Sequence, residues 1–84
     1  MSDTLDLLVG GGKGAPEKLL IIERPTADGQ VRVRSWTSDD WSAMPTSADR
    51  SASGLLDEIE AAVRTGRSVN QEMSVVRRWL GSRT

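Results

Sequence analysis

The chain contains no cysteine, histidine, tyrosine or phenylalanine. Without cysteine there is no disulfide framework, no thiol chemistry and no cysteine-ligated metal, which fits a reducing compartment. Without histidine, the commonest general base and the commonest activator of a serine nucleophile are both missing. A Ser-Lys pair would need Lys13 or Lys18, which lie in a glycine-rich segment and at the start of an expected strand. We therefore expect no enzymatic activity, no metal site and no cofactor.

Long hydrophobic runs are also missing. No apolar stretch approaches the roughly 20 residues of a membrane span, and the acidic N-terminal segment lacks the positive region of a signal peptide. Residues 74–83 combine an apolar stripe with arginines, but that stripe is wide enough to be a core face. We expect a soluble, cytoplasmic protein without membrane contact, and its 84 residues suffice for one small domain, 1–84.

Charge is unevenly distributed along the chain. Residues 1–63 hold six basic against eleven acidic side chains, whereas residues 64–84 hold five arginines against Glu72 alone. The whole chain has a net charge of -1 and a pI near 5.3. This composition is unlike the basic domains that usually bind nucleic acid.

The stretch Lys18–Thr37 predicts a β-hairpin. Residues 19–22 form a β-favouring apolar run, and residues 31–36 alternate between apolar and polar side chains. Between these arms, Pro25 fixes φ and Gly29 can adopt the positive φ of a tight turn. A third strand over residues 4–9, with Leu5, Leu7 and Val9 on one side, would explain why residues 19–22 are apolar on both faces; otherwise residues 1–17 form a flexible tail.

The register of the hairpin decides which side chains face inward, and two turn lengths compete. A four-residue loop, 26–29, places Ile22 opposite Val33 and Glu23 opposite Arg32, whereas a three-residue loop opposes like charges. We favour the four-residue loop. It divides the side chains between an inner face with Leu20, Ile22, Val31 and Val33, and an outer face with Leu19, Ile21, Arg34 and Trp36.

Two further segments are predicted to be loops. Residues 10–14 contain four glycines and Lys13, but they lack the serine or threonine and the following helix of a phosphate loop, so we interpret them as a connector. Residues 37–50 are rich in serine, aspartate and threonine. Within them, residues 38–41 predict one helical turn that Pro45 stops, with Asp39 and Asp40 as solvated first-turn acids.

The last third of the chain predicts two helices. The first runs over 54–65, capped by Ser53 and stopped by Gly66. The second runs over 69–80, because Ser68 and Gln71 match a capping box. A link this short predicts an αα-hairpin. The residues expected in the core are Ile22, Val33, Ile59, Val63, Val76 and Leu80.

Glu72 interrupts the apolar stripe of the second helix. A carboxylate there must be paired or reach solvent at the rim, and we favour an ion pair with Arg32 or Arg34 over an interface contact. Taken together, these patterns predict an α+β fold: a small antiparallel sheet, either a hairpin or three strands, covered on one face by a C-terminal αα-hairpin.

The uncovered outer face suggests the function. Leu19, Ile21, Arg34 and Trp36 would form an aromatic-anchored patch with a charged rim, as interface cores do. We therefore expect a non-enzymatic module for protein interaction or oligomerisation, with another protein or a second copy as partner. Two alternatives remain. In the first, the face is covered, either by residues 1–17 or by the loop that carries Trp41 and Met44. In the second, the face binds single-stranded nucleic acid through Arg32, Arg34 and Trp36.

Overall fold

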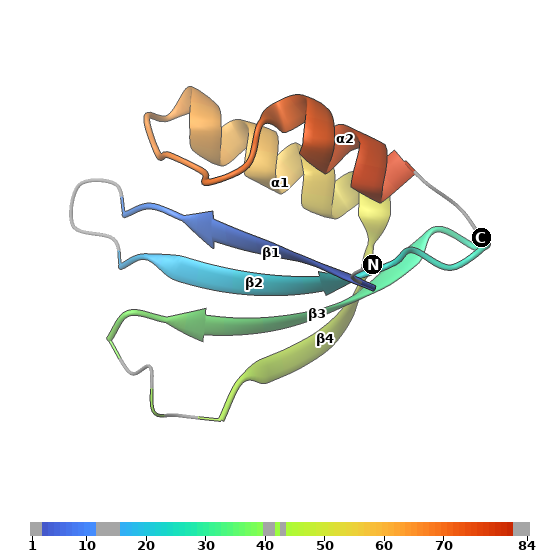
Figure 1. Ribbon diagram of the computed structural model, residues 1–84, viewed down its shortest axis with the longest axis horizontal. Helices are drawn as coiled ribbons and strands as arrows, with labels where there is room; N and C mark the ends of the chain where they lie inside the picture. Colours follow the sequence, from blue (N-terminus) through green and yellow to red (C-terminus); the bar gives the residue numbers. More distant parts are fainter. Residues whose placement is uncertain (1–2, 12–15, 40–41, 43, 82–84) are drawn as a thin grey trace.

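The computed structural model describes residues 3–11, 16–39, 42 and 44–81. These form four strands and two helices in the order β1 (Thr4–Val9), β2 (Lys18–Glu23), β3 (Gln30–Thr37), β4 (Thr46–Ser51), α1 (Ala52–Arg64) and α2 (Met73–Gly81). The strands form one antiparallel sheet in the order β1-β2-β3-β4, and both helices lie on the same face of it (Figure 1). The α+β class is confirmed, but the sheet has four strands rather than two or three.

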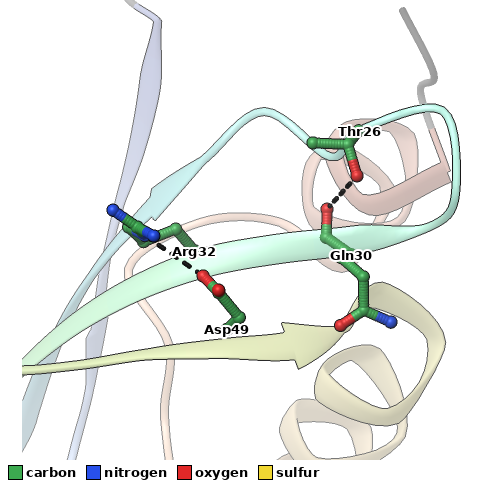
Figure 2. A network of polar contacts seen from close by, with 4 residues as sticks. All are labelled: Thr26, Gln30, Arg32 and Asp49. Atoms are coloured by element: carbon green, nitrogen blue, oxygen red, sulfur yellow. Dashed lines mark hydrogen bonds and ion pairs between the residues drawn. The ribbon is translucent and has the colours of Figure 1, made fainter.

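The register of β2 against β3 is the one predicted with the four-residue loop, but the turn itself closes around the three residues 27–29, because the N–H of Gly29 donates to the Thr26 carbonyl at 2.9 Å. Ile22 pairs with Val33, as that register requires. The backbone N–H of Thr26 donates to the carbonyl of Gln30 at 2.8 Å. Thr26 Oγ1 lies 3.1 Å from the same oxygen (Figure 2). Gly29 has φ 81°, a conformation that a side chain would disfavour, and Gly66 has φ 93° after α1. The predicted positive φ of Gly29 and the predicted helix stop at Gly66 are therefore confirmed.

β4 is the element that the sequence pattern concealed. Its residues, TSADRS, contain neither a β-branched aliphatic residue nor an aromatic one, yet all six pair with β3. The loop prediction for residues 37–50 is therefore wrong over residues 46–50. β4 is an edge strand with mostly exposed side chains, so backbone pairing with β3 can hold it without an apolar face. Ser38 and Asp39 form a turn, whereas Asp40 and Trp41 lie outside the described residues.

α1 starts earlier than its sequence predicts. Ser51, not Ser53, caps it, because the Ser51 hydroxyl accepts a hydrogen bond from the N–H of Gly54 at 3.2 Å. The first N–H of the helix, that of Ala52, donates to the carbonyl of Gly29 at 2.8 Å and so ties the helix to the β2–β3 turn. Val63 was expected in the core but is 36% exposed, since the buried stripe of α1 follows Ala52, Leu55 and Ile59 instead.

α2 starts at Met73, four residues after the predicted position, so the capping-box prediction for Ser68 and Gln71 is wrong. Residues 68–70 run beside β1 instead: Gly10 N–H donates to the Ser68 carbonyl at 2.7 Å, and Asn70 N–H donates to the Leu8 carbonyl at 3.2 Å. Val9 and Val69 form a β-bridge. The link between the helices is therefore not a short turn; it also covers the outer edge of β1.

Glu72 precedes α2 rather than lying in its stripe. Its side chain is exposed, and its backbone carbonyl accepts hydrogen bonds from the N–H groups of Val75 and Val76. The predicted pairing with Arg32 or Arg34 is wrong, because Arg32 pairs with Asp49 and the ion pairs of the described residues do not include Glu72.

The core lies between the helices and the inner face of the sheet. Five of the six expected core residues are buried there, Val63 being the exception. The strand alternation of residues 4–9 is confirmed, since Leu7 and Val9 are buried and Leu5 packs against them. The buried apolar residues are Leu7, Val9, Ile22, Val31, Val33, Ala52, Leu55, Ile59, Val76 and Leu80.

Candidate interaction surfaces

The face of the sheet opposite the helices brings the predicted interface residues together. Strand register places Leu8, Leu19 and Trp36 side by side across β1, β2 and β3, and we call these three the apolar row. The next row across the same strands is Asp6, Ile21 and Arg34, which we call the charged row. We refer to the whole surface as the open face. The four candidates predicted from the sequence thus form one contiguous patch.

The apolar side chains of this patch are half-buried, whereas Asp6 and Arg34 are exposed. Met44, one of the residues considered as a cover, is 89% exposed and does not cover the patch. Trp41, the other, lies outside the described residues. Sequence reasoning missed Leu8, which could be assigned to this face only once residues 4–9 were known to pair with β2.

Arg32 lies on the open face but is already paired. Its Nε donates to Asp49 Oδ1 at 3.1 Å, across from β3 to β4 (Figure 2). This hydrogen bond, followed by the charges of Asp49 and Glu23, raises the pKa of Arg32. Both partners are more than half exposed, so the pair adds little stability. Its main effect is to neutralise a cation that the nucleic-acid alternative requires.

The open face as a whole is slightly acidic. Its described charged groups are the cations Arg32 and Arg34 and the carboxylates of Asp6, Glu23 and Asp49. Trp36 is the one aromatic side chain of this face in the four strands. A platform for single strands normally combines a basic groove with several stacking aromatics.

A second concave surface lies on the other side of the sheet, between α1 and the inner faces of the strands. It is a cavity of about 220 Å³. Its apolar walls come from the sheet and from α1, namely Val9, Leu20, Val33, Ala48, Leu55, Ile59 and Ala62. Its polar lining consists of Lys18, Ser35, Thr46, Arg50, Glu58 and Arg67.

Arg67 lines one end of this cavity and is fixed there by hydrogen bonds to two backbone carbonyls. Its Nε donates to the Gly10 carbonyl at 2.8 Å and its Nη2 donates to the Pro16 carbonyl at 3.0 Å. Lys18 is opposite Val9 in the strand register, so its backbone lies next to Gly10, whose carbonyl binds Arg67. At the other end, Arg50 forms an ion pair with Glu58. The cavity therefore has one neutralised end and one end with two cations.

At the opposite end of the molecule, Trp79 of α2 fixes the start of the β2–β3 turn. Its Nε1 donates to the Glu23 carbonyl at 3.1 Å, and the Arg24 guanidinium lies 4.4 Å from the centre of its ring. These contacts bury the indole edge against the turn and provide a cation-π interaction. We regard them as structural, because they join α2 to the sheet.

The described residues contain no group of three or more acidic side chains placed to hold a metal ion. Neither described helix is long and apolar enough to span a membrane. No protein-family model matches the chain, and the searches of curated proteins and of solved structures gave no significant match.

Proposed function

We propose that this chain is a non-enzymatic interaction module that associates with a second copy of itself through the open face. The observation that carries the proposal is the charged row. Across β1, β2 and β3 it presents an acid, an aliphatic side chain and a base, namely Asp6, Ile21 and Arg34. A surface with this order is complementary to a copy of itself turned by 180°.

The symmetry follows from the sheet. If two open faces stack about a two-fold axis parallel to β2, β1 of one subunit lies across from β3 of the other. Asp6 then faces Arg34 of the second copy, and this pair occurs twice. Ile21 packs against its own copy on the axis. In the apolar row, Leu8 faces Trp36, so both rows find complementary partners in the same arrangement.

The spacing of stacked sheets and the composition of the open face both favour packing of the two copies. Sheets pack face to face about 10 Å apart, close enough for the half-buried Leu19, Ile21 and Trp36 to interdigitate. An aromatic anchor surrounded by aliphatic side chains and a charged rim is typical of interface centres. The nucleic-acid alternative is less well supported, because the open face carries more carboxylates than cations and Arg32 is paired with Asp49.

The first test is the mass of the full chain in solution, measured by sedimentation equilibrium over a wide range of protein concentration. We expect a dimer. Ile21→Lys would place two cations against each other on the axis and should give a monomer that retains its circular dichroism spectrum. Val63→Lys is the matched control, because Val63 is a partly exposed apolar residue of α1 away from the open face. A wild-type chain that stays monomeric at every concentration would refute the proposal.

A charge exchange tests the symmetry itself. Asp6→Arg alone and Arg34→Asp alone should each weaken the dimer about tenfold, because each sets like charges against one another twice. The double variant restores opposite charges at both contacts and should dimerise like the wild type. A double variant no better than the singles would contradict this two-fold arrangement.

A further inference from the structure

The cavity between α1 and the sheet has the size of a small ligand. An apolar cavity of about 150 Å³ can hold benzene, so 220 Å³ admits a short aliphatic chain or a single ring. It is smaller than the roughly 300 to 1,000 Å³ of sites for drug-sized molecules. The ligand class it fits is therefore a small one with an apolar body.

The cavity is open at its β4 side. Thr46 and Ala48 line it from β4, and both side chains are exposed, although their faces point toward the helix layer. α1 therefore leaves Thr46 and Ala48 uncovered on the inner face of β4, whereas Arg50 of the same face pairs with Glu58 of α1. Val33 and Ile59 line the cavity between the sheet and α1. Both of these side chains are almost fully buried, so the inner wall of the cavity is apolar.

The lining residues that the structure describes carry a net positive charge. Arg50 is neutralised by Glu58, the one acidic side chain among these described lining residues. Lys18 has no ion pair among the described residues, and Arg67 is bound to two carbonyl oxygens, which leave its charge uncompensated. A guanidinium has five N–H donors, so Arg67 retains donors for another acceptor. An anionic group complements this end of the cavity.

We propose that this cavity binds a small amphipathic monocarboxylate, such as a medium-chain fatty acid. The aliphatic body lies between α1 and the sheet, and the carboxylate lies at the end formed by Lys18 and Arg67. Apolar burial supplies the affinity, and the charge-assisted hydrogen bonds select the head group. The inference does not depend on self-association, since the cavity and the open face lie on opposite sides of the sheet.

The test is a titration of the isotope-labelled full chain with butanoate, hexanoate and octanoate, followed by NMR. Affinity should rise about fourfold for each added methylene until the cavity is full. The changes in backbone amide chemical shift on addition of the carboxylate should be largest around Val33, Ala48 and Ile59. Octylammonium, with the same tail and the opposite charge, should not bind. A series without chain-length dependence, or equal binding of octylammonium, would overturn the proposal.

Two pairs of variants locate the site. Ala48→Leu fills the entrance from an exposed position and should weaken octanoate binding about tenfold, whereas Ser47→Leu, on the opposite face of the same strand, should not. Lys18→Met removes one cation and should also cost about tenfold, whereas Arg78→Met, on the exposed side of α2, should not. Equal effects within either pair would show that octanoate binds elsewhere and refute the assignment. Sedimentation of the same variants separates this result from self-association.

Discussion

Asp28 lies at the tip of the β2–β3 turn, where its carboxylate accepts a hydrogen bond from Thr26 Oγ1. This bond is the largest cause that lowers the pKa of Asp28 below its ordinary value of 3.8, and backbone N–H donors of the turn act in the same direction. The lower pKa means that the folded state favours the ionised form. Stability from this group is therefore complete above about pH 3.8 and is lost as the pH falls through the folded pKa.

Thr26→Val should raise the pKa of Asp28 toward its ordinary value, because the hydroxyl donor is removed. The check is a carboxyl carbon NMR titration of both proteins between about pH 2 and 6, a window that spans the titration of an aspartate. Urea unfolding should show that the stability difference between the two proteins narrows at the acid end. Asp28→Asn is the control, since it cannot titrate. An unchanged titration midpoint in Thr26→Val would contradict the assignment.

Arg32 shows why single residues could not be paired from sequence alone. Its expected partners were Glu23 across the hairpin and Glu72 on the second helix. The observed partner is Asp49, which is directly opposite Arg32 on β4. Glu23 contributes only through its charge. The pairing depends on a strand without an apolar signal, so it became visible only when the sheet was complete.

At the scale of elements, two β-branched aliphatic residues of α1, Ile59 and Val63, differ in how far their side chains are exposed. Ile59 is 2% exposed in the core, and Val63, one turn later, is 36% exposed. We expect Ile59→Ala to reduce the free energy of unfolding by about 2 to 5 kcal/mol, because it removes buried methyl groups and leaves a cavity. Val63→Ala should change it by about 0.5 kcal/mol or less, as surface substitutions usually do.

Urea denaturation of both variants, followed by circular dichroism, measures this difference. Leu80→Ala on α2 should behave like Ile59→Ala, since Leu80 is 5% exposed in the same core. Similar unfolding midpoints for Ile59→Ala and Val63→Ala would be incompatible with the packing of α1 on the sheet.

For the whole molecule, the net charge of -1 and the slightly acidic open face lead us to expect no binding of single-stranded nucleic acid. A fluorescence anisotropy titration of labelled DNA and RNA oligonucleotides of about 12 bases, within the usual site size, measures this at low and at physiological salt. The expectation would be contradicted by micromolar affinity for the oligonucleotides that falls steeply with added salt and is lost in Trp36→Ala. Steep salt dependence would indicate counterion release from phosphates.

Whole-molecule organisation also explains how the two sheet edges differ. The outer edge of β1 is covered by residues 68–70, and Leu8 N–H donates to the side-chain oxygen of Asn70 at 2.8 Å. β4 ends the sheet on the other side with polar and charged side chains. Uncovered edges invite strand pairing between chains, and charges on the edge oppose it. The open face is therefore the more suitable surface for association with a second copy.

Local sequence determined those features that depend on neighbours in the chain. The alternation in residues 31–36, the turn glycine Gly29 and the stop at Gly66 need only steric rules and periodicity, and all three agree with the structure. The predicted register of the hairpin, with Ile22 opposite Val33, is confirmed, although the turn closes around residues 27–29 rather than 26–29. The patch of Leu19, Ile21, Arg34 and Trp36 follows from that register.

Tertiary structure decided the features that depend on distant partners. β4 is a strand because β3 supplies its hydrogen bonds, although its own side chains carry no strand signal. Residues 68–70 leave their capping-box pattern because pairing with β1 satisfies more backbone groups. The cavity exists because Leu55 and Ile59 of α1 pack into the core with residues of β2 and β3, whereas Thr46 and Ala48 of β4 stay exposed.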